Sequence, residues 1–218
     1  MEDFEFLEKR FGGWWCGVKF GRGSGEDIRP APHPMRFCEA VAASRTGPIV
    51  LTPGLMNCPG GARSLGWKID EQKMVRTLAD KAGLDVEMAH DLIRDTPRIA
   101  KPSEFVTVGT QDNPDIVISY AHPDVVMGLV REWQALDGRS PLTRISGFMS
   151  VCGAVAANAY LKRRLCVSFG CPDARQYGGI GRDRLVIGFP MRQVARLRRR
   201  GRKGTMAAAS SGSGRGRS

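Results

Sequence analysis

The chain has 218 residues, a mass of 23.8 kDa and a formal net charge of +11. Hydrophobic residues make up 42% and charged residues 25%, which is typical of globular proteins and argues against a wholly disordered chain. No apolar stretch reaches the ~20 residues that span a bilayer, and the acidic N-terminal residues do not resemble a signal peptide. We therefore expect a cytoplasmic protein with no membrane span.

Apolar spacing and turn residues predict both helices and strands in the first half of the chain. In order, they are a helix over 1–11, a strand over 14–20, a helix over 36–44, a strand over 49–51, helices over 70–82 and 86–94, and a strand over 105–109. Glycines follow the first strand at 21, 23 and 25, but acidic residues and prolines come next. Because no helix start faces these glycines, we expect a flexible loop there and no phosphate-binding loop.

The second half continues in the same way. Its predicted elements are a strand over 116–121, helices over 123–136 and 153–162, strands over 166–169 and 185–189, and a last helix that ends near residue 200. This mixture predicts a single α+β domain with a mixed sheet flanked by helices.

The excess charge is concentrated at the C-terminus. Residues 192–218 hold nine basic side chains and no acidic one, so residues 1–191 are nearly neutral. We therefore divide the chain into a body over 1–191 and an appendage over 192–218, which consists of a basic helix end and a tail rich in Arg, Gly, Ser and Ala. Such a tail is either a solvated segment or a nucleic-acid contact, and it has no aromatic residue for base stacking.

An internal repeat is the most informative feature of the sequence. Residues 38–44 and 152–158 are identical at five of seven positions, and a Cys-Pro pair follows the first cysteine of each copy after 20 and 19 residues. Each pair precedes an Ala-Arg pair and a glycine, so the copies extend over about 36–66 and 150–178. A duplication of this kind predicts two pseudo-symmetric halves that meet at a twofold axis.

The repeat predicts that four cysteines converge: Cys38, Cys58, Cys152 and Cys171. Each is expected at the start of a helix, where the dipole lowers the pKa of a thiol. Proline at the first helical position suits the two Cys-Pro turns. Four adjacent thiolates would repel one another without a metal, so they favour Zn²⁺ or an iron–sulfur cluster. A redox or nucleophilic thiol and a purely structural role remain open. Cys16 and Cys166 have no partner in the repeat and are expected to be buried in strands.

Three arginines lie near the predicted ligands. Arg63 and Arg175 occupy equivalent positions in the two copies, and Arg36 precedes Cys38 by two residues. Their guanidinium groups are candidates to bind an anionic substrate or to donate to cluster sulfurs, although Arg63 and Arg175 are equally suited to hold loop carbonyls. Among the histidines, only His33 is close enough in sequence to reach this site.

The cysteine motifs resemble those of a prokaryotic family known as domain of unknown function 169, or ArCR. The resemblance covers about residues 14–195. The matching segments are 17–20, 35–40, 57–63 with 65–66, 151–153, 168–171 with 174–175, 177–179 and 186–190. The resemblance supports the four-cysteine set and implies a [4Fe–4S] cluster rather than zinc.

Two classes of function follow from this expectation. In the first, the cluster, with the arginines as an anion clamp, performs redox or Lewis-acid chemistry on a small anionic substrate. In the second, the protein is a non-catalytic electron carrier that docks on a redox partner, or a structural zinc protein. Nucleic acid is expected as a partner only through the basic tail.

Overall fold

The computed structural model describes residues 1–21, 29–145 and 147–200. The glycine loop at 22–28 and the tail at 201–218 lie outside the described residues, so the expectations for them stay predictions. Helices and strands together form an α+β domain around one seven-stranded sheet, which confirms the predicted fold class.

Up to residue 109, the described residues form seven helices or helical turns and three strands. They are α1 (Glu2–Phe11), β1 (Cys16–Gly21), α2 (Phe37–Ala43), η1 (Ser44–Thr46), β2 (Ile49–Leu51), η2 (Pro53–Leu55), α3 (Pro59–Ser64), α4 (Glu71–Ala82), α5 (Val86–Asp95) and β3 (Phe105–Gly109), followed across a turn by β4 (Ile116–Ala121) and α6 (Pro123–Asp137). The later elements are β5 (Leu142–Thr143), η3 (Ser150–Ala157), α7 (Asn158–Lys162), β6 (Cys166–Ser168), α8 (Pro172–Tyr177), β7 (Leu185–Pro190) and η4 (Met191–Gln193).

The strands lie in the order β2-β3-β1-β4-β7-β6-β5. All neighbouring pairs are antiparallel except β5 and β6. Counted outward from the β1–β4 pair, β1, β3 and β2 on one side correspond to β4, β7 and β6 on the other. A twofold axis between β1 and β4 would relate strands in this order, as a duplication requires. The repeat itself stays a prediction.

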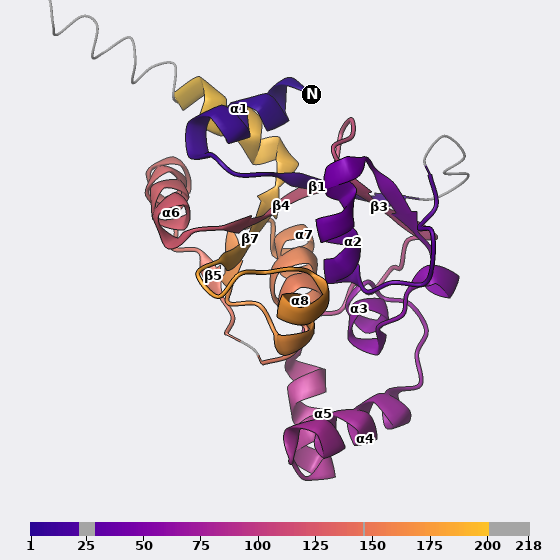
Figure 1. Cartoon of the computed structure of the whole chain (residues 1–218). Coiled ribbons are helices and arrows are strands. Elements are labelled where there is room, and N and C mark those ends of the chain that lie inside the picture. Colours follow the sequence, from indigo (N-terminus) through magenta and orange to yellow (C-terminus); the bar gives the residue numbers. More distant parts are fainter. Residues whose placement is uncertain (22–28, 146, 201–218) are drawn as a thin grey trace, which may run out of the picture.

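Both faces of the sheet are covered by helices, because its central strands alternate apolar residues between two cores. In β4, Ile116 and Ile118 belong to the larger core, beside α2, α3 and η3, whereas Val117 faces the opposite core. That second core packs under α1 and α6, where Trp133 of α6 meets Phe189 of β7 with ring centroids 5.7 Å apart. Figure 1 shows α1 and α6 on the side away from α2, α3 and α8.

The basic helix end is anchored to the body. Val194 and Leu197 are fully buried in the second core, and Arg198 pairs with Glu2 and Asp3 of α1 at 3.0 and 3.3 Å. Residues 194–200 are helical, as the sequence predicted, and the apolar side chains of this helix pack with the body. Among the described helices, none has both the length and the apolar composition of a bilayer span.

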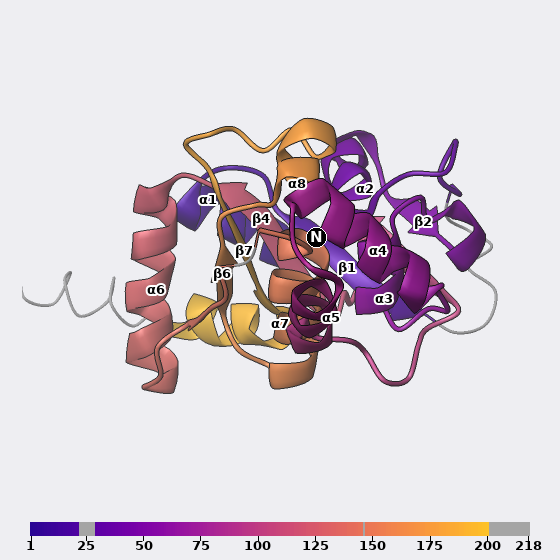
Figure 2. The same ribbon diagram turned by 90° about the horizontal axis from the view of Figure 1, so that it is seen from below.

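The hairpin of α4 and α5 stands at the end of the molecule opposite α1 (Figures 1 and 2). Its helices begin where the sequence offers N-cap side chains. The carboxylates of Asp70 and Asp85 accept the backbone N–H groups of Lys73 and Met88 at 2.9 and 2.7 Å. Gly83 ends α4 in the left-handed conformation, with φ of 62°. Local chemistry thus accounts for the predicted helices at 70–82 and 86–94.

The helix predicted over 153–162 takes a different form. Residues Ser150–Ala157 are a π-helix, which continues as the α-helix α7. The backbone N–H groups of Gly153 and Ala154 both donate to the carbonyl of Met149, at 2.9 Å each, and Met149 itself has a φ of 53°. A π-helical turn of this kind widens a helix and is frequent at functional sites.

Candidate metal centre

Each of the four repeat cysteines lies at the beginning of a helical segment. Cys38 is the second residue of α2, and Cys152 is the third residue of the π-helix. Cys58 and Cys171 are the N-caps of α3 and α8, with a proline at the first helical position of both helices. These positions are the ones that the sequence predicted.

All four cysteines line one cavity of about 400 Å³. Cys38, Cys152 and Cys171 are buried, with 7 to 8% of each residue exposed, and Cys58 is partly buried. No disulfide joins any of the six cysteines of the chain. The structure thus brings together the residues that the repeat predicted to converge, and their role as ligands stays a prediction.

The described residues contain no group of three or more His, Cys, Asp or Glu side chains drawn together closely enough to hold one metal ion. A single tetrahedral Zn²⁺ bound at about 2.3 Å to each sulfur needs such a compact group.

Close helix packing fixes where these cysteines lie. Around the cavity, α2 packs against α8, and α3 packs against the π-helix, so each contact joins the two halves of the chain. Glycine permits both approaches. A Cβ atom at Gly178 would lie 3.0 Å from the carbonyl oxygen of Cys38 on α2, and one at Gly153 would lie 3.1 Å from the Ser64 hydroxyl oxygen on α3.

Burial controls the protonation of the thiols. Desolvation, together with the neighbouring Cys171 and Cys58, raises the pKa of Cys38 to about 12. It also raises the pKa of Cys58 and of Cys152. The pKa of each of these three thiols is therefore raised, whereas the helix starts predicted a lowered value. In Cys58, hydrogen bonding to the backbone at Gly61 and the charge of Arg36 do lower the pKa, but desolvation outweighs both.

Hydrogen bonds orient the cysteine segments. The backbone N–H of Gly61 donates to the Sγ atom of Cys58 at 3.4 Å, and Ser64 hydrogen-bonds to the thiol of Cys152. The Ser150 hydroxyl accepts the backbone N–H of Cys171 at 2.6 Å. Such contacts around a thiolate adjust its direction and its electron density when it binds a metal.

Arg36 lies against three of the four cysteine segments. It is the N-cap of α2, and its guanidinium donates to the carbonyl of Asn57, next to Cys58, at 3.2 Å. Its Nε atom lies 3.5 Å from an Asp173 carboxylate oxygen, and its guanidinium carbon is 3.9 Å from the centroid of the Tyr177 ring on α8. Arg36 therefore places a positive charge beside the cysteines while it ties their helices together.

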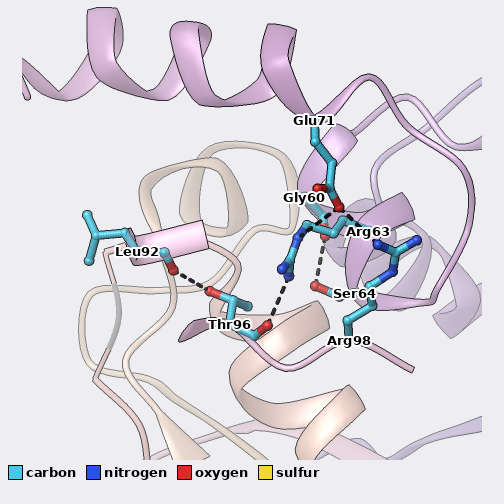
Figure 3. Close-up of polar contacts among 7 residues, drawn as sticks. All are labelled: Gly60, Arg63, Ser64, Glu71, Leu92, Thr96 and Arg98. Carbon is cyan, nitrogen blue, oxygen red and sulfur yellow. Dashed lines mark hydrogen bonds and ion pairs between the residues drawn. The ribbon is translucent and has the colours of Figure 1, made fainter. Parts of the chain in front are cut away.

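Arg63 and Arg175 point to loop carbonyls rather than into the cavity. Arg63 is buried and donates to the carbonyl of Thr96 at 2.9 Å, while its Nε atom lies 3.8 Å from the carboxylate of Glu71. Figure 3 shows the side chain between α4 and the end of α5. Arg175 donates to the carbonyls of Phe169 and Gly181 at 2.7 and 2.8 Å. Both therefore make the contacts of the second alternative that the sequence left open.

The remaining candidates lie elsewhere. His33, Cys16 and Cys166 are not among the residues that line the cavity. Cys16 is fully buried 3.4 Å from the Ser44 hydroxyl, and Cys166 is fully buried in β6, as the sequence predicted for both.

Sequence reasoning missed one wall of the cavity. This wall comes from α4, which supplies Met74, Thr77, Leu78 and Lys81. Their spacing is that of one helix face, but an amphipathic face at this spacing is ordinary in any packed helix. No feature of the sequence predicted that this face of α4 would line the cysteine cavity.

Comparison with known proteins identifies relatives without a described activity. A sequence model of the family described as Uncharacterised ArCR, a domain of unknown function, matches residues 17–199. An uncharacterised protein of Methanocaldococcus jannaschii is 24% identical over 165 residues, which are 71% of this chain and 71% of that protein. No solved structure matches the chain.

Proposed function

The chain belongs to the Uncharacterised ArCR family, and from this premise we propose that it is an iron–sulfur protein that binds a [4Fe–4S] cluster. The proposed ligands are Cys38, Cys58, Cys152 and Cys171. The observation that carries the proposal is that these four cysteines, from four different helical segments, all line one cavity. Four cysteine thiolates are the usual ligand set of such a cluster.

The size of the cavity favours a cluster over a single zinc ion. Zinc is a single ion that would need its four sulfurs close together, whereas a cluster core of eight atoms holds the four sulfurs farther apart. A cavity of about 400 Å³ has room for the eight atoms of a cluster core. Structural zinc is therefore the alternative that the geometry favours less.

The electrostatics are consistent with a metal that completes the site. Because burial raises the pKa of Cys38 to about 12, its thiol is protonated at neutral pH unless a cation replaces the proton. Binding of the cluster would therefore release protons. The backbone N–H groups at the helix starts, together with Arg36, would then offset the negative charge of four thiolates.

When bound, the cluster supplies electron transfer or, at an iron with an open position, Lewis-acid chemistry. We propose that it serves chemistry on a small anionic substrate, because the cavity extends beyond the cysteines to α4. Arg36 is the candidate arginine that stands beside the cysteines, where its charge would stabilise thiolate or an approaching anion. A non-catalytic electron carrier with a redox partner protein is the alternative, and it would need no such extension.

The test is anaerobic purification of the full chain, with iron, sulfide and zinc analysis and a visible spectrum on the same sample. About four iron and four sulfide ions per chain are expected. Cys58→Ser should lower the iron content, whereas the matched control Cys166→Ser should keep it, because Cys166 does not line the cavity. About one zinc ion per chain in a colourless protein would instead support a structural zinc site. A metal-free protein with titratable thiols would leave a thiol-based redox function.

A further inference from the structure

The cavity that the cysteines line has a second wall, whose side chains the proposed cluster does not need. Met74, Thr77, Leu78 and Lys81 of α4 form most of it, and Phe148, in the loop before the π-helix, adds to it. The four α4 residues lie on one face of the helix because they are three, four and seven residues apart. A helix is thus set opposite the cysteines with one face turned to the cavity.

This wall changes from apolar to polar toward solvent. Met74 and Leu78 are buried, whereas Thr77 and Lys81 are exposed. The Thr77 hydroxyl donates to the backbone carbonyl of Lys73 at 2.8 Å, so it is already used as a donor within the helix. The ammonium group of Lys81 is therefore the donor that the wall offers at the mouth of the cavity.

The charges around the cavity are few. Its charged lining residues are Lys81 and Asp173, and Asp173 lies 3.5 Å from the Nε atom of Arg36. Within residues 1–21, 29–145 and 147–200, Lys81 forms no ion pair of its own. One unmatched positive charge stands at the mouth, in front of an apolar interior.

The cavity is larger than a cluster core. Its volume is about 400 Å³, and its lining reaches beyond the four cysteines to Met74, Leu78 and Phe148. A cluster core bound by the cysteines would therefore leave the α4 side of the cavity open. A small organic molecule fits between the cysteines and α4.

We propose that this wall is a binding subsite for a small monocarboxylate with an apolar body. The carboxylate pairs with Lys81 at the mouth, and the apolar body packs on Met74, Leu78 and Phe148 with its far end toward the cysteines. Four thiolates give the bound cluster a net negative charge, which repels a polyanion inside the cavity, whereas a single carboxylate held at the mouth stays away from it. The inference rests on the proposed function and names its substrate class.

The test uses the full chain, both loaded with its cluster and without metal, in a ligand-observed NMR titration. The probe is butanoate, and the comparison probes are butan-1-ol, which lacks the charge, and inorganic phosphate, which lacks the apolar body. Butanoate should bind more tightly than either. Lys81→Gln should weaken butanoate binding about twofold to fivefold, the range of an exposed ion pair, and leave butan-1-ol unchanged. The matched control Lys73→Gln lies on the same helix outside the cavity lining and should change neither.

Met74→Trp should weaken both butanoate and butan-1-ol by filling the apolar interior, and the iron content of every variant shows whether the cluster is retained. Equal binding of butanoate by the wild type and Lys81→Gln would overturn the inference, as would no butanoate binding by either form of the wild type. If the protein contains no iron, the proposed function fails, yet Lys81-dependent binding by the metal-free chain would still support the subsite.

Discussion

The contact between α2 and α8 at Gly178 offers the sharpest test of how the cysteine site is built. A Cβ atom added at this glycine would lie 2.6 Å from the carbonyl oxygen of Ala174, and 3.0 and 3.1 Å from the carbonyl oxygen and Cβ atom of Cys38. Two of these three atoms are backbone, which cannot rotate away as a flexible side chain can. We therefore predict that Gly178→Ala separates α8 from the start of α2.

The magnitude follows from two opposing effects. Gly178 has a φ of −89°, which alanine adopts without strain, so alanine by itself would stabilise the fold by about 0.4–1 kcal/mol through the unfolded chain. Overpacking costs about 1–3 kcal/mol and outweighs that gain. For a domain of this size, a net loss of about 1–2 kcal/mol lowers Tm by roughly 2–8 °C. Because Cys38 and Cys171 begin the two helices that separate, iron content should fall as well.

The assay is urea unfolding and thermal melting of the metal-free chain, with iron analysis of the loaded chain. Gly128→Ala is the matched control, since it lies inside α6 and a Cβ atom there would meet no atom within 4 Å. That control should raise the free energy of unfolding by about 0.5–1 kcal/mol. The reasoning is refuted if Gly178→Ala is as stable as the wild type and binds as much iron.

Three further predictions follow from the described contacts. Arg63→Met should lower the free energy of unfolding by about 2–3 kcal/mol, because it leaves a buried carbonyl unpaired. The control Arg98→Met breaks only a half-exposed pair with Glu71 and should lower the free energy of unfolding by less than about 1 kcal/mol. Equal losses of the two variants in urea unfolding would contradict this prediction. Burial raises the pKa of Cys16 from 9.0 to about 12, so the stability gained from its protonated thiol is complete below pH 9 and is lost as the pH rises toward 12. Over this range the free energy of unfolding of the wild type should fall more steeply than that of Cys16→Ala. Parallel curves would refute the raised pKa of Cys16. A chain that ends after Arg200 should melt as the full chain does, whereas one that ends after Met191 loses two buried side chains worth about 3–6 kcal/mol together. Salt-dependent nucleic-acid binding by the tail should therefore be tested with the chain that ends after Arg200, because the chain that ends after Met191 also destabilises the body.

Local chemistry made the cysteine positions predictable. A cysteine followed by proline is suited to the N-cap of a helix, and Cys58 and Cys171 have that role. The helices α4 and α5 were predictable for the same reason, since Asp70 and Asp85 cap them with their own side chains. Periodicity also located most strands of the sheet, although it missed the two-residue strand β5.

Packing decided what periodicity could not. Residues 150–157 form a π-helix that packs against α3, with Gly153 beside Ser64. Because π-helices are rare, the apolar pattern of this segment predicted the commoner α-helix.

The sequence by itself determined that four cysteines begin helical segments and that the charge gathers at the C-terminus. Only the tertiary structure decided that these thiols share one desolvated cavity, where burial outweighs the helix starts and raises the pKa of Cys38. It also decided that Arg63 holds a backbone carbonyl and that Lys81 stands at the cavity mouth. The physical reason is the distance along the chain over which each effect acts. Capping and proline effects act within one helical turn, whereas desolvation and cavity shape arise from residues that are distant in sequence and packed together in space.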